Sequence, residues 1–466
     1  MFGFLAIMSG LFSSCGSNAA DPHTIEFWHT SGQGLTEFYE RAASDFTKLV
    51  KENEGVDITI KCSYQGGYDD IYDKITKSFA SGSTPTLAIA YPDHVADYLA
   101  LEKTAGQYVV NLKTLADDSS VGFGKEGWIG DGEASDFVQT FYEEGQQYVR
   151  SGMYSLPFMK STEVMYYNYD ILKQFVFGFN PDLKSETQVR KWMTTLDWDT
   201  FIDLAEYINK NKGADSSIEA PIWYDSDSNL FITQLYQRDI PYLSVDQTNN
   251  KLSVDFNNDK AKAFVTELKG YYDEGLLETK GTGGTYGSNN FVDRKSVFSI
   301  GSSGGAGYQD PTGQFSYGVC EVPYANKNKM YITQGPTLTL LRNPGVTDDV
   351  NDERVRYAWK FMKYLTSTSV NNTLCLEGSE GYVPVRESCY KTEEYLGMLE
   401  DGTSITNETA RVISEQIQEK YIVTPSVKGS AAARDAVGGL VTQVLLGNKT
   451  LDKAFSDAVD ATKYAM

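Results

Sequence analysis

The sequence predicts an α/β fold in which helices cover a mainly parallel sheet. Apolar and polar residues alternate over 24–28, which indicates a strand, and apolar residues recur at helical spacing over 33–53. Further strands are predicted at 56–60 and 87–90, with an amphipathic helix at 68–79 between them. Strand, helix, strand, helix, strand in this order is typical of a parallel sheet with helical connections.

The rest of the chain continues this mixed pattern. No repeat with a period of 20–50 residues is present, which argues against a solenoid. The remaining predicted elements are an aromatic strand at 163–168, helices at 198–208 (with Asp197 as N-cap), 258–276, 351–368 and 430–466 (with a break at Gly447 and Asn448), and a glycine-rich loop at 281–290.

Length and composition limit the classes of protein to which the chain can belong. At roughly 150 residues per domain, 466 residues predict two or three domains. Hydrophobic residues at 41% and charged residues at 22% are typical of a folded chain. The net charge of -22 repels phosphate backbones and therefore argues against a nucleic acid partner.

Cysteine and histidine are scarce, and neither forms a metal-binding pattern. The five cysteines contain no CxxC pair, and no two of the three histidines have metal-ligand spacing. We therefore expect neither a metal site nor a cofactor. Cys375 and Cys389 either form a disulfide across a short loop or remain two buried thiols.

The N-terminal segment resembles a bacterial lipoprotein signal. A short apolar run ends in Ser13 and Ser14 and is followed by Cys15. The resemblance implies that 1–22 comprise the signal and a tether, that Cys15 is lipidated, and that the protein is periplasmic or anchored outside the cell membrane. Phe12 departs from the usual small aliphatic residue, and no Lys or Arg precedes the run. The alternative is a buried N-terminal helix.

Six short segments in order resemble the extracellular solute-binding proteins of bacterial ABC importers, in the sn-glycerol-3-phosphate- and sugar-binding group. Together they cover most of the chain after the tether. They are TIEFWHTSG (24–32), KCSYQGGYDDIYDKITKSFASGSTPTLAIAYPD (61–93), LPFMKSTEVMYYNYDIL (156–172), LDWDTFIDLAEYI (196–208), FVDRKSVFSIGSSGG (291–305) and EGYVPVRESCY (380–390).

This resemblance implies a bilobed periplasmic-binding-protein fold of type II-like architecture. Two discontinuous α/β lobes are then joined by a hinge, with the ligand in the cleft between them. We expect 24–157 with 294–340 in the N-lobe, and 158–293 with 341–466 in the C-lobe. The implied function is capture of a small polar solute by a monomer that delivers it to ABC permease subunits in the membrane.

Ligand contacts are expected where the matched segments end in loops. Tyrosine, of which the chain has 31, supplies both an aromatic face and a hydroxyl for a sugar or glycerol compound. Each candidate also has a purely structural interpretation, as a helix cap, turn, packing residue or solvated charge. The candidates are Tyr68, Asp93, Ser161, Thr162, Trp223, Tyr224, Ser302, Ser303, Gly304, Gly335, Tyr382, Lys428 and Arg434.

The sequence leaves the ligand open between a glycerophosphoryl compound and a neutral saccharide. Lys428, Arg434 and the N–H groups of 302–304 would suit an anion. The segment 222–231 instead adds Asp225 and Asp227, whose carboxylates would repel a phosphate and suit sugar hydroxyls.

Two other classes of protein remain as alternatives. The segment 301–305 matches GxSxG, but no histidine follows His94, which argues against a serine hydrolase of the α/β-hydrolase order. No carboxylate pair is singled out for glycoside hydrolysis, so we expect a protein that is not an enzyme. A surface adhesin or structural lipoprotein with the same fold is the second alternative.

Overall fold

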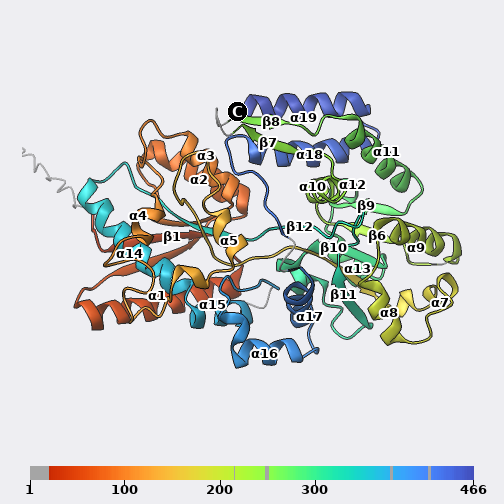
Figure 1. Cartoon of the computed structure of the whole chain (residues 1–466), viewed down its shortest axis with the longest axis horizontal. Coiled ribbons are helices and arrows are strands. Elements are labelled where there is room, and N and C mark those ends of the chain that lie inside the picture. The colour runs from red at the N-terminus through yellow and green to blue at the C-terminus, as the bar shows by residue number, and fades with distance from the viewer. Residues whose placement is uncertain (1–19, 215, 247–250, 378–380, 418–420) are drawn as a thin grey trace, which may run out of the picture.

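Two sheets, each covered by helices, form the two lobes of the protein in a computed structural model (Figure 1). The structure describes residues 20–214, 216–246, 251–377, 381–417 and 421–466, so Cys15 and the predicted signal lie outside the described residues. The strand orders are β2-β1-β3-β13-β4 in the N-lobe and β11-β5-β10-β6-β9 in the C-lobe. The predicted bilobed α/β fold is therefore confirmed.

The strands of the two large sheets come from distant parts of the chain. The N-lobe sheet consists of β1 (Thr24–His29), β2 (Thr59–Tyr64), β3 (Leu87–Ala90), β4 (Leu156–Pro157) and β13 (Thr337–Leu340). The C-lobe sheet consists of β5 (Glu163–Asn168), β6 (Ile222–Tyr224), β9 (Leu277–Thr279), β10 (Phe298–Ser302) and β11 (Tyr317–Glu321). Two small sheets pair β7 (Leu243–Asp246) with β8 (Lys251–Val254), and β12 (Tyr331–Ile332) with β14 (Tyr421–Ile422).

In the N-lobe, alternation along β3 explains how helices cover both faces of the sheet. Leu87 and Ile89 belong to the apolar cluster that contains the helices α1 and α14, whereas Ala88 and Ala90 belong to the cluster of α2 and α3. These helices are α1 (Gln33–Glu54), α2 (Tyr68–Ser81), α3 (Pro92–Ala100) and α14 (Asp348–Leu365); α4 (Leu112–Ala116), α5 (Gln139–Glu144) and α15 (Thr368–Glu377) complete the lobe.

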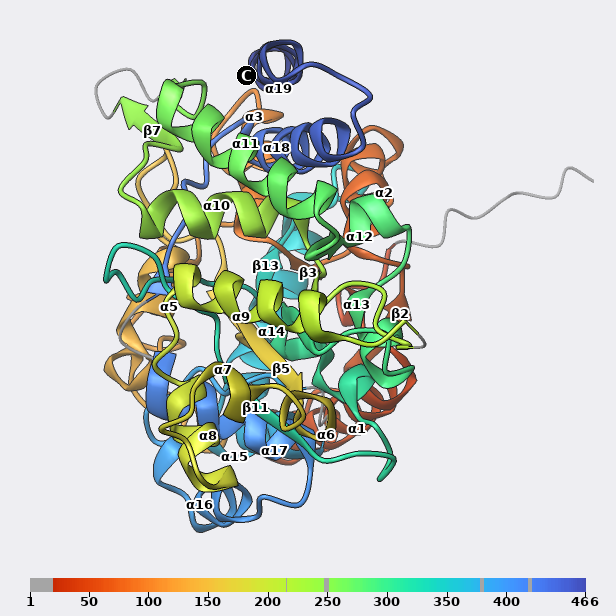
Figure 2. The same ribbon diagram turned by 90° about the vertical axis from the view of Figure 1, so that its right-hand side faces the viewer.

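In the C-lobe, every residue of β5 is buried. The helix α9 (Trp198–Asn211) begins as predicted at Asp197, whose side chain accepts a hydrogen bond from the Thr200 N–H. The helices α18 (Ser430–Leu445) and α19 (Leu451–Ala465) lie side by side on this lobe (Figure 2). The others are α6 (Tyr169–Leu172), α7 (Val176–Phe179), α8 (Glu186–Met193), α10 (Asp227–Gln237), α11 (Asp259–Asp273), α12 (Lys280–Gly283), α13 (Gly287–Val292), α16 (Glu393–Glu400) and α17 (Ile405–Val412).

Some local predictions need correction. The second strand begins at Thr59 and not at 56, and the predicted loop at 281–290 contains most of α12 and α13. Of the two alternatives for Cys375 and Cys389, the structure has two buried free thiols, and the other described cysteines are free as well. None of the helices in the described part of the chain combines the length and apolarity needed to cross a membrane.

The lobe boundaries also differ from those predicted. We expected 294–340 in the N-lobe, but β10 and β11 pair with β5 in the C-lobe sheet and only β13 returns to the N-lobe. We expected 341–466 in the C-lobe, but Trp359 and Phe361 of α14 pack in the N-lobe cluster. Pairing partners and packing surfaces far away in the sequence decide these assignments, so local periodicity did not indicate them.

Three chain segments cross between the lobes and are hydrogen-bonded to one another. The Lys160 N–H donates to the Val383 carbonyl at 3.1 Å, and the Val383 N–H donates back at 2.8 Å. Ser161 and Gln334 exchange the same pair of bonds at 3.0 and 2.8 Å. These bonds are isolated β-bridges, and they satisfy backbone groups of the crossing segments next to the space between the lobes.

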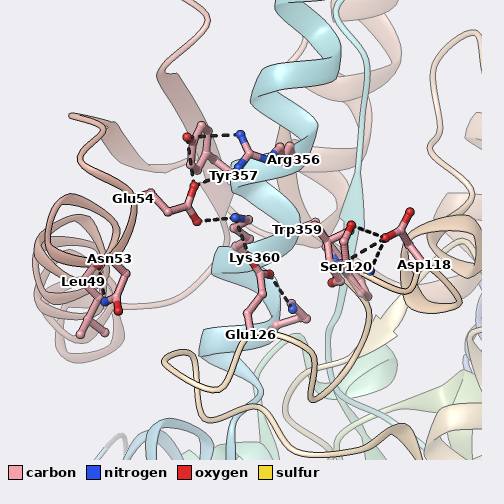
Figure 3. Close-up of polar contacts among 12 residues, drawn as sticks. Leu49, Asn53, Glu54, Asp118, Ser120, Glu126, Arg356, Tyr357, Trp359 and Lys360 are labelled. Carbon is pink, nitrogen blue, oxygen red and sulfur yellow. Dashed lines mark hydrogen bonds and ion pairs between the residues drawn. The ribbon is translucent and has the colours of Figure 1, made fainter.

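A buried ionic network holds α14 in the N-lobe (Figure 3). Lys360, whose side chain is 2% exposed, binds Glu54 of α1 and lies 2.6 Å from Glu126. Lys363 reaches Glu126 at 3.0 Å and the Gly122 carbonyl at 3.1 Å. The network therefore joins α1, α14 and the segment around Glu126, and its charges are compensated where water is excluded.

We predict that Lys360→Met destabilises the protein by about 2 kcal/mol, because Glu54 and Glu126 lose the buried cation that they share and keep only Arg356 and Lys363 among the described residues. Urea unfolding of the two proteins measures this difference. The matched control is Lys48→Met, which removes an ion pair with Asp45 whose lysine is 65% exposed, and we expect a change below about 0.5 kcal/mol. Equal losses in the two variants would contradict the network's role.

Candidate ligand site

A cavity of about 870 Å³ lies between the lobes. This is within the range of about 300–1,000 Å³ that small-molecule sites occupy. The N-lobe contributes the beginnings of α2 and α3, the C-lobe contributes the ends of β6 and β10 and part of α18, and the crossing segments contribute residues such as Gln334 and Gly335. Ligands of open α/β sheets bind outside the carboxyl ends of the strands, as here.

Tyrosines supply the aromatic surfaces of the cavity. Tyr68 and Tyr91 stack with ring centroids 4.0 Å apart. Burial raises the pKa of Tyr91 to about 12 and holds that of Tyr68 well above its ordinary value, so both hydroxyls stay protonated and can donate or accept hydrogen bonds. The described tyrosines on the cavity wall are Tyr68, Tyr91, Tyr242, Tyr286, Tyr308 and Tyr382.

Carboxyl groups outnumber cations on the cavity wall, and two of the cations are already paired. Lys160 lies 2.6 Å from Glu144, and Arg434 lies 3.0 Å from Asp93. Lys280 donates to the Tyr286 hydroxyl at 2.7 Å. The described charged residues of the wall are Asp69, Asp93, Glu144, Glu163, Asp225 and Asp435 on the acidic side, and Lys160, Lys280 and Arg434 on the basic side.

The carboxyl group of Glu163 is buried, and only one of its two oxygen atoms accepts close hydrogen bonds. The residue is 2% exposed, and its Oε2 accepts hydrogen bonds from Tyr224 at 2.6 Å and Thr233 at 3.4 Å. Its Oε1 makes no close hydrogen bond among the described residues, although the side chain borders the cavity and the Asn229 amide faces the carboxyl and lowers its pKa. Burial raises the pKa of Glu163 to about 8, and the nearby Asp225 raises it too. Burial also raises the pKa of Asp225, to about 6.

The lobes touch each other beside the cavity through α3 and α18. The Asp93–Arg434 ion pair joins these helices, and the Gly429 N–H donates to Asp97 Oδ1 at 3.3 Å. Arg434 also lies over the ring of Tyr91, with its guanidinium carbon 5.0 Å from the centroid. Arg434 therefore connects the two lobes at the cavity rim.

Seven of the thirteen predicted ligand residues border the cavity, and six do not. Those that border it come from both lobes and from a crossing segment: Tyr68, Asp93, Ser302, Gly304, Gly335, Tyr382 and Arg434. Those that do not are Ser161, Thr162, Trp223, Tyr224, Ser303 and Lys428.

Most of the second group have structural partners elsewhere. The Thr162 hydroxyl donates to the Ile332 carbonyl at 2.8 Å, and the Ser303 N–H donates to the Thr162 carbonyl at 2.7 Å. Ser161 bonds Gln334 through its backbone, and the Tyr224 hydroxyl donates to Glu163. Trp223 is buried behind the cavity wall, and Lys428 is exposed.

Sequence analysis missed several residues of the wall. Glu163 follows directly after the predicted Ser161–Thr162 pair, so its position at the start of a strand was the available signal. Asp225 was noted beside Trp223, and it borders the cavity, whereas Asp227 accepts hydrogen bonds from Thr279 and Gly281 outside the cavity. No local pattern distinguished these two aspartates.

Two lobes that enclose a polar, tyrosine-lined cavity beside hydrogen-bonded crossing segments are the architecture of a bilobed binding protein. The sequence model of the bacterial extracellular solute-binding protein family matches residues 41–396, about three quarters of the chain. The chain belongs to this family, as the resemblance predicted. A comparison with curated proteins gave no match.

Solved structures share the fold over nearly their whole length. The cyclic alpha-maltosyl-1,6-maltose binding protein from Arthrobacter globiformis is 15% identical, with a TM-score of 0.68 over 96% of this chain and 99% of that chain. Lmo0181 from Listeria monocytogenes, in complex with cycloalternan, is 15% identical, with a TM-score of 0.69 over 95% and 98%. UgpB from Mycobacterium tuberculosis, in complex with glycerophosphocholine, is 14% identical, with a TM-score of 0.68 over 95% and 98%.

We predict that Gly335→Ala destabilises the protein by about 2 kcal/mol. Gly335 has φ +95°, and an added Cβ would lie 2.3 Å from the Met159 carbonyl oxygen in the neighbouring crossing segment. The control is Gly270→Ala within α11, where no atom lies within 4 Å of the added Cβ and helix propensity predicts a gain of about 0.5–1 kcal/mol. Thermal unfolding measures both; a neutral Gly335→Ala would show that the crossing segments tolerate a side chain.

We predict that Glu163→Gln becomes more stable relative to the native protein as pH rises from 5 to 8. The folded-state pKa of about 8 exceeds the usual 4.5, so the native protein loses stability over this interval as unfolding releases the bound proton. The slope approaches about 1.4 kcal/mol per pH unit. Chemical unfolding at several pH values tests this. A pH-independent difference between the two proteins would contradict a protonated Glu163.

Proposed function

We propose that this protein captures a saccharide outside the cell and delivers it to an ABC importer. The observation that carries this proposal is the charge arrangement of the cavity. Its tyrosines offer faces for sugar C–H surfaces, and its carboxyls offer acceptors for hydroxyl groups. The binding of hydroxyl-rich solutes by the Arthrobacter and Listeria proteins of the same fold supports this choice.

The same arrangement disfavours a phosphate ligand. Arg434 and Lys160 are engaged with Asp93 and Glu144, so an anion would have to compete with these carboxylates. The predicted anion loop is also occupied: the Ser303 N–H donates to the Thr162 carbonyl, and the Gly304 N–H donates to the Ser302 hydroxyl at 3.3 Å. A glycerophosphoryl solute is therefore the second candidate, supported by the fold shared with UgpB.

The rest of the proposal concerns how the protein works in the cell. The two lobes close on the solute by bending at the crossing segments, and the closed form docks as a monomer on the permease subunits. Lipidation at Cys15 keeps the protein at the outer side of the membrane. No catalytic step is proposed: the described cavity wall contains no histidine, and its carboxyls serve as hydrogen-bonding groups.

We predict that neutral mono- and oligosaccharides, but not glycerol-3-phosphate or glycerophosphocholine, raise the melting temperature of the chain from Gly16 onward. A ligand at 100 times its dissociation constant adds about 2.7 kcal/mol to the stability of the folded state. Tyr91→Ala, which removes the ring stacked on Tyr68, should reduce the shift. Stabilisation by the phosphate compounds alone would overturn the saccharide proposal. No stabilisation by any solute would favour an adhesin.

A further inference from the structure

The helices α3 and α18 meet beside the cavity, but each is held by the core of its own lobe. Val95 of α3 is buried in the N-lobe cluster of α2 and α3, whereas Val437 of α18 is buried in the C-lobe cluster. Both helices lie in the upper part of the view in Figure 1, one on each lobe. The contact between them therefore breaks when the lobes move apart, because each helix moves with its own core.

The sequence at the beginning of α3 orients the Asp93 carboxylate toward the other lobe. Pro92 and Asp93 lie in the first turn, where proline fits and where the positive end of the helix dipole stabilises a carboxylate. The His94 N–H donates to Asp93 Oδ1 at 2.9 Å, and Asp93 Oδ2 lies 3.0 Å from Arg434 Nη1. Asp93 is buried, so solvent screens this ion pair only weakly.

Arg434 has its partners in the opposite lobe. Asp93 is its one ion-pair partner among the described residues, and its guanidinium carbon lies 5.0 Å from the ring centroid of Tyr91, which also belongs to the N-lobe. Asp435 is the next residue of α18, and adjacent residues of a helix do not face one another. Arg434 therefore gains its ion pair and its cation–π contact only when the lobes are together.

A backbone hydrogen bond crosses the same contact. The Gly429 N–H, just before α18, donates to Asp97 Oδ1 at 3.3 Å, and Asp97 Oδ2 accepts from the Tyr72 hydroxyl of α2 at 3.2 Å. Asp93 and Asp97 are four residues apart in α3, so they lie on the same face of that helix. The N-lobe thus presents two carboxylates at helical spacing, and the beginning of α18 supplies a donor to each.

We propose that Asp93 and Arg434 form a latch that stabilises the closed arrangement of the lobes, with or without solute, and thereby sets the affinity of the cavity for every solute that it accepts. This inference rests on the proposed function, in which the lobes close on a solute. The observed affinity of such a protein depends on the fraction of molecules in the form that is competent to bind. A bond present only in the closed form raises that fraction, so Asp93 and Arg434 act as positioning residues.

A latch and a direct ligand contact lead to different losses when they are removed. The latch acts between the lobes, so its removal weakens the binding of all solutes by a similar factor. Removal of a ligand contact weakens binding most for the solutes that reach that contact. The sequence predicted that Asp93 and Arg434 contact the ligand, and a comparison of several solutes distinguishes the two roles.

The test compares Asp93→Asn and Arg434→Gln with the native protein in calorimetry with glucose, maltose and maltotriose. We expect both variants to bind each sugar that the native protein binds about fivefold more weakly or worse, by a similar factor for each sugar. Exchange of the two charges, Asp93→Arg with Arg434→Asp, should recover part of the loss. In small-angle scattering without sugar, both single variants should have a larger radius of gyration, because fewer molecules are closed.

Asp452→Asn is the control, matched in the exposure of the cation that loses its partner. Lys262 of α11 lies 2.6 Å from Asp452 of α19 and is 27% exposed, as Arg434 is 28% exposed, but both helices belong to the C-lobe. We expect this variant to keep its affinity and its radius of gyration.

Three results would overturn the latch: equal losses in the control, a loss confined to one of several bound sugars, or an unchanged radius of gyration in both latch variants. If none of these sugars binds, the saccharide function fails, and the radius of gyration alone then decides whether the latch exists.

Discussion

The hydrogen bonds among the three crossing segments decide where the two lobes meet and where the cavity lies. Lys160 bonds Val383 and Ser161 bonds Gln334, which satisfies the backbone at a place where the chain leaves both large sheets. Gly335 allows the close approach of two of these segments, because no side chain fits there. With this base in place, the carboxyl ends of β6 and β10 and the beginnings of α2 and α3 face one another across the cavity.

The charges of the molecule are used in two different ways. In the N-lobe, Lys360 and Lys363 are surrounded by carboxylates, so burial is compensated and the network ties α14 in place. In the cavity the balance is reversed, because the buried Glu163 and the half-buried Asp225 have no ion-pair partner among the described residues and have raised pKa values. Such uncompensated groups reduce the stability of the empty protein and are typical of functional sites.

Local periodicity predicted most elements and about half of the site. The strands at β1, β3 and β5 and the helices α1, α2 and α9 follow from alternation, helical spacing and the cap at Asp197. Tyr68 and Asp93 were found because each lies near the beginning of a helix in a matched segment, and Arg434 was found as a basic residue late in the chain. Thr162 and Ser303 were predicted to contact the ligand, but their polar groups form hydrogen bonds within the protein. Residue type did not distinguish these two uses, because the same polar groups can bind a ligand or a neighbouring chain segment.

The sequence by itself determined the fold class, the family and the tyrosine-rich composition from which the cavity wall is built, because these depend on residue types and on patterns within short segments. Only the tertiary structure decided that β10 and β11 belong to the C-lobe and α14 to the N-lobe, since their partners are distant in the chain. It also decided which charges of the cavity are paired. Arg434 of the C-lobe meets Asp93 of the N-lobe, whereas Glu163 is buried at the cavity wall without a cation among the described residues, and no local pattern contains either arrangement.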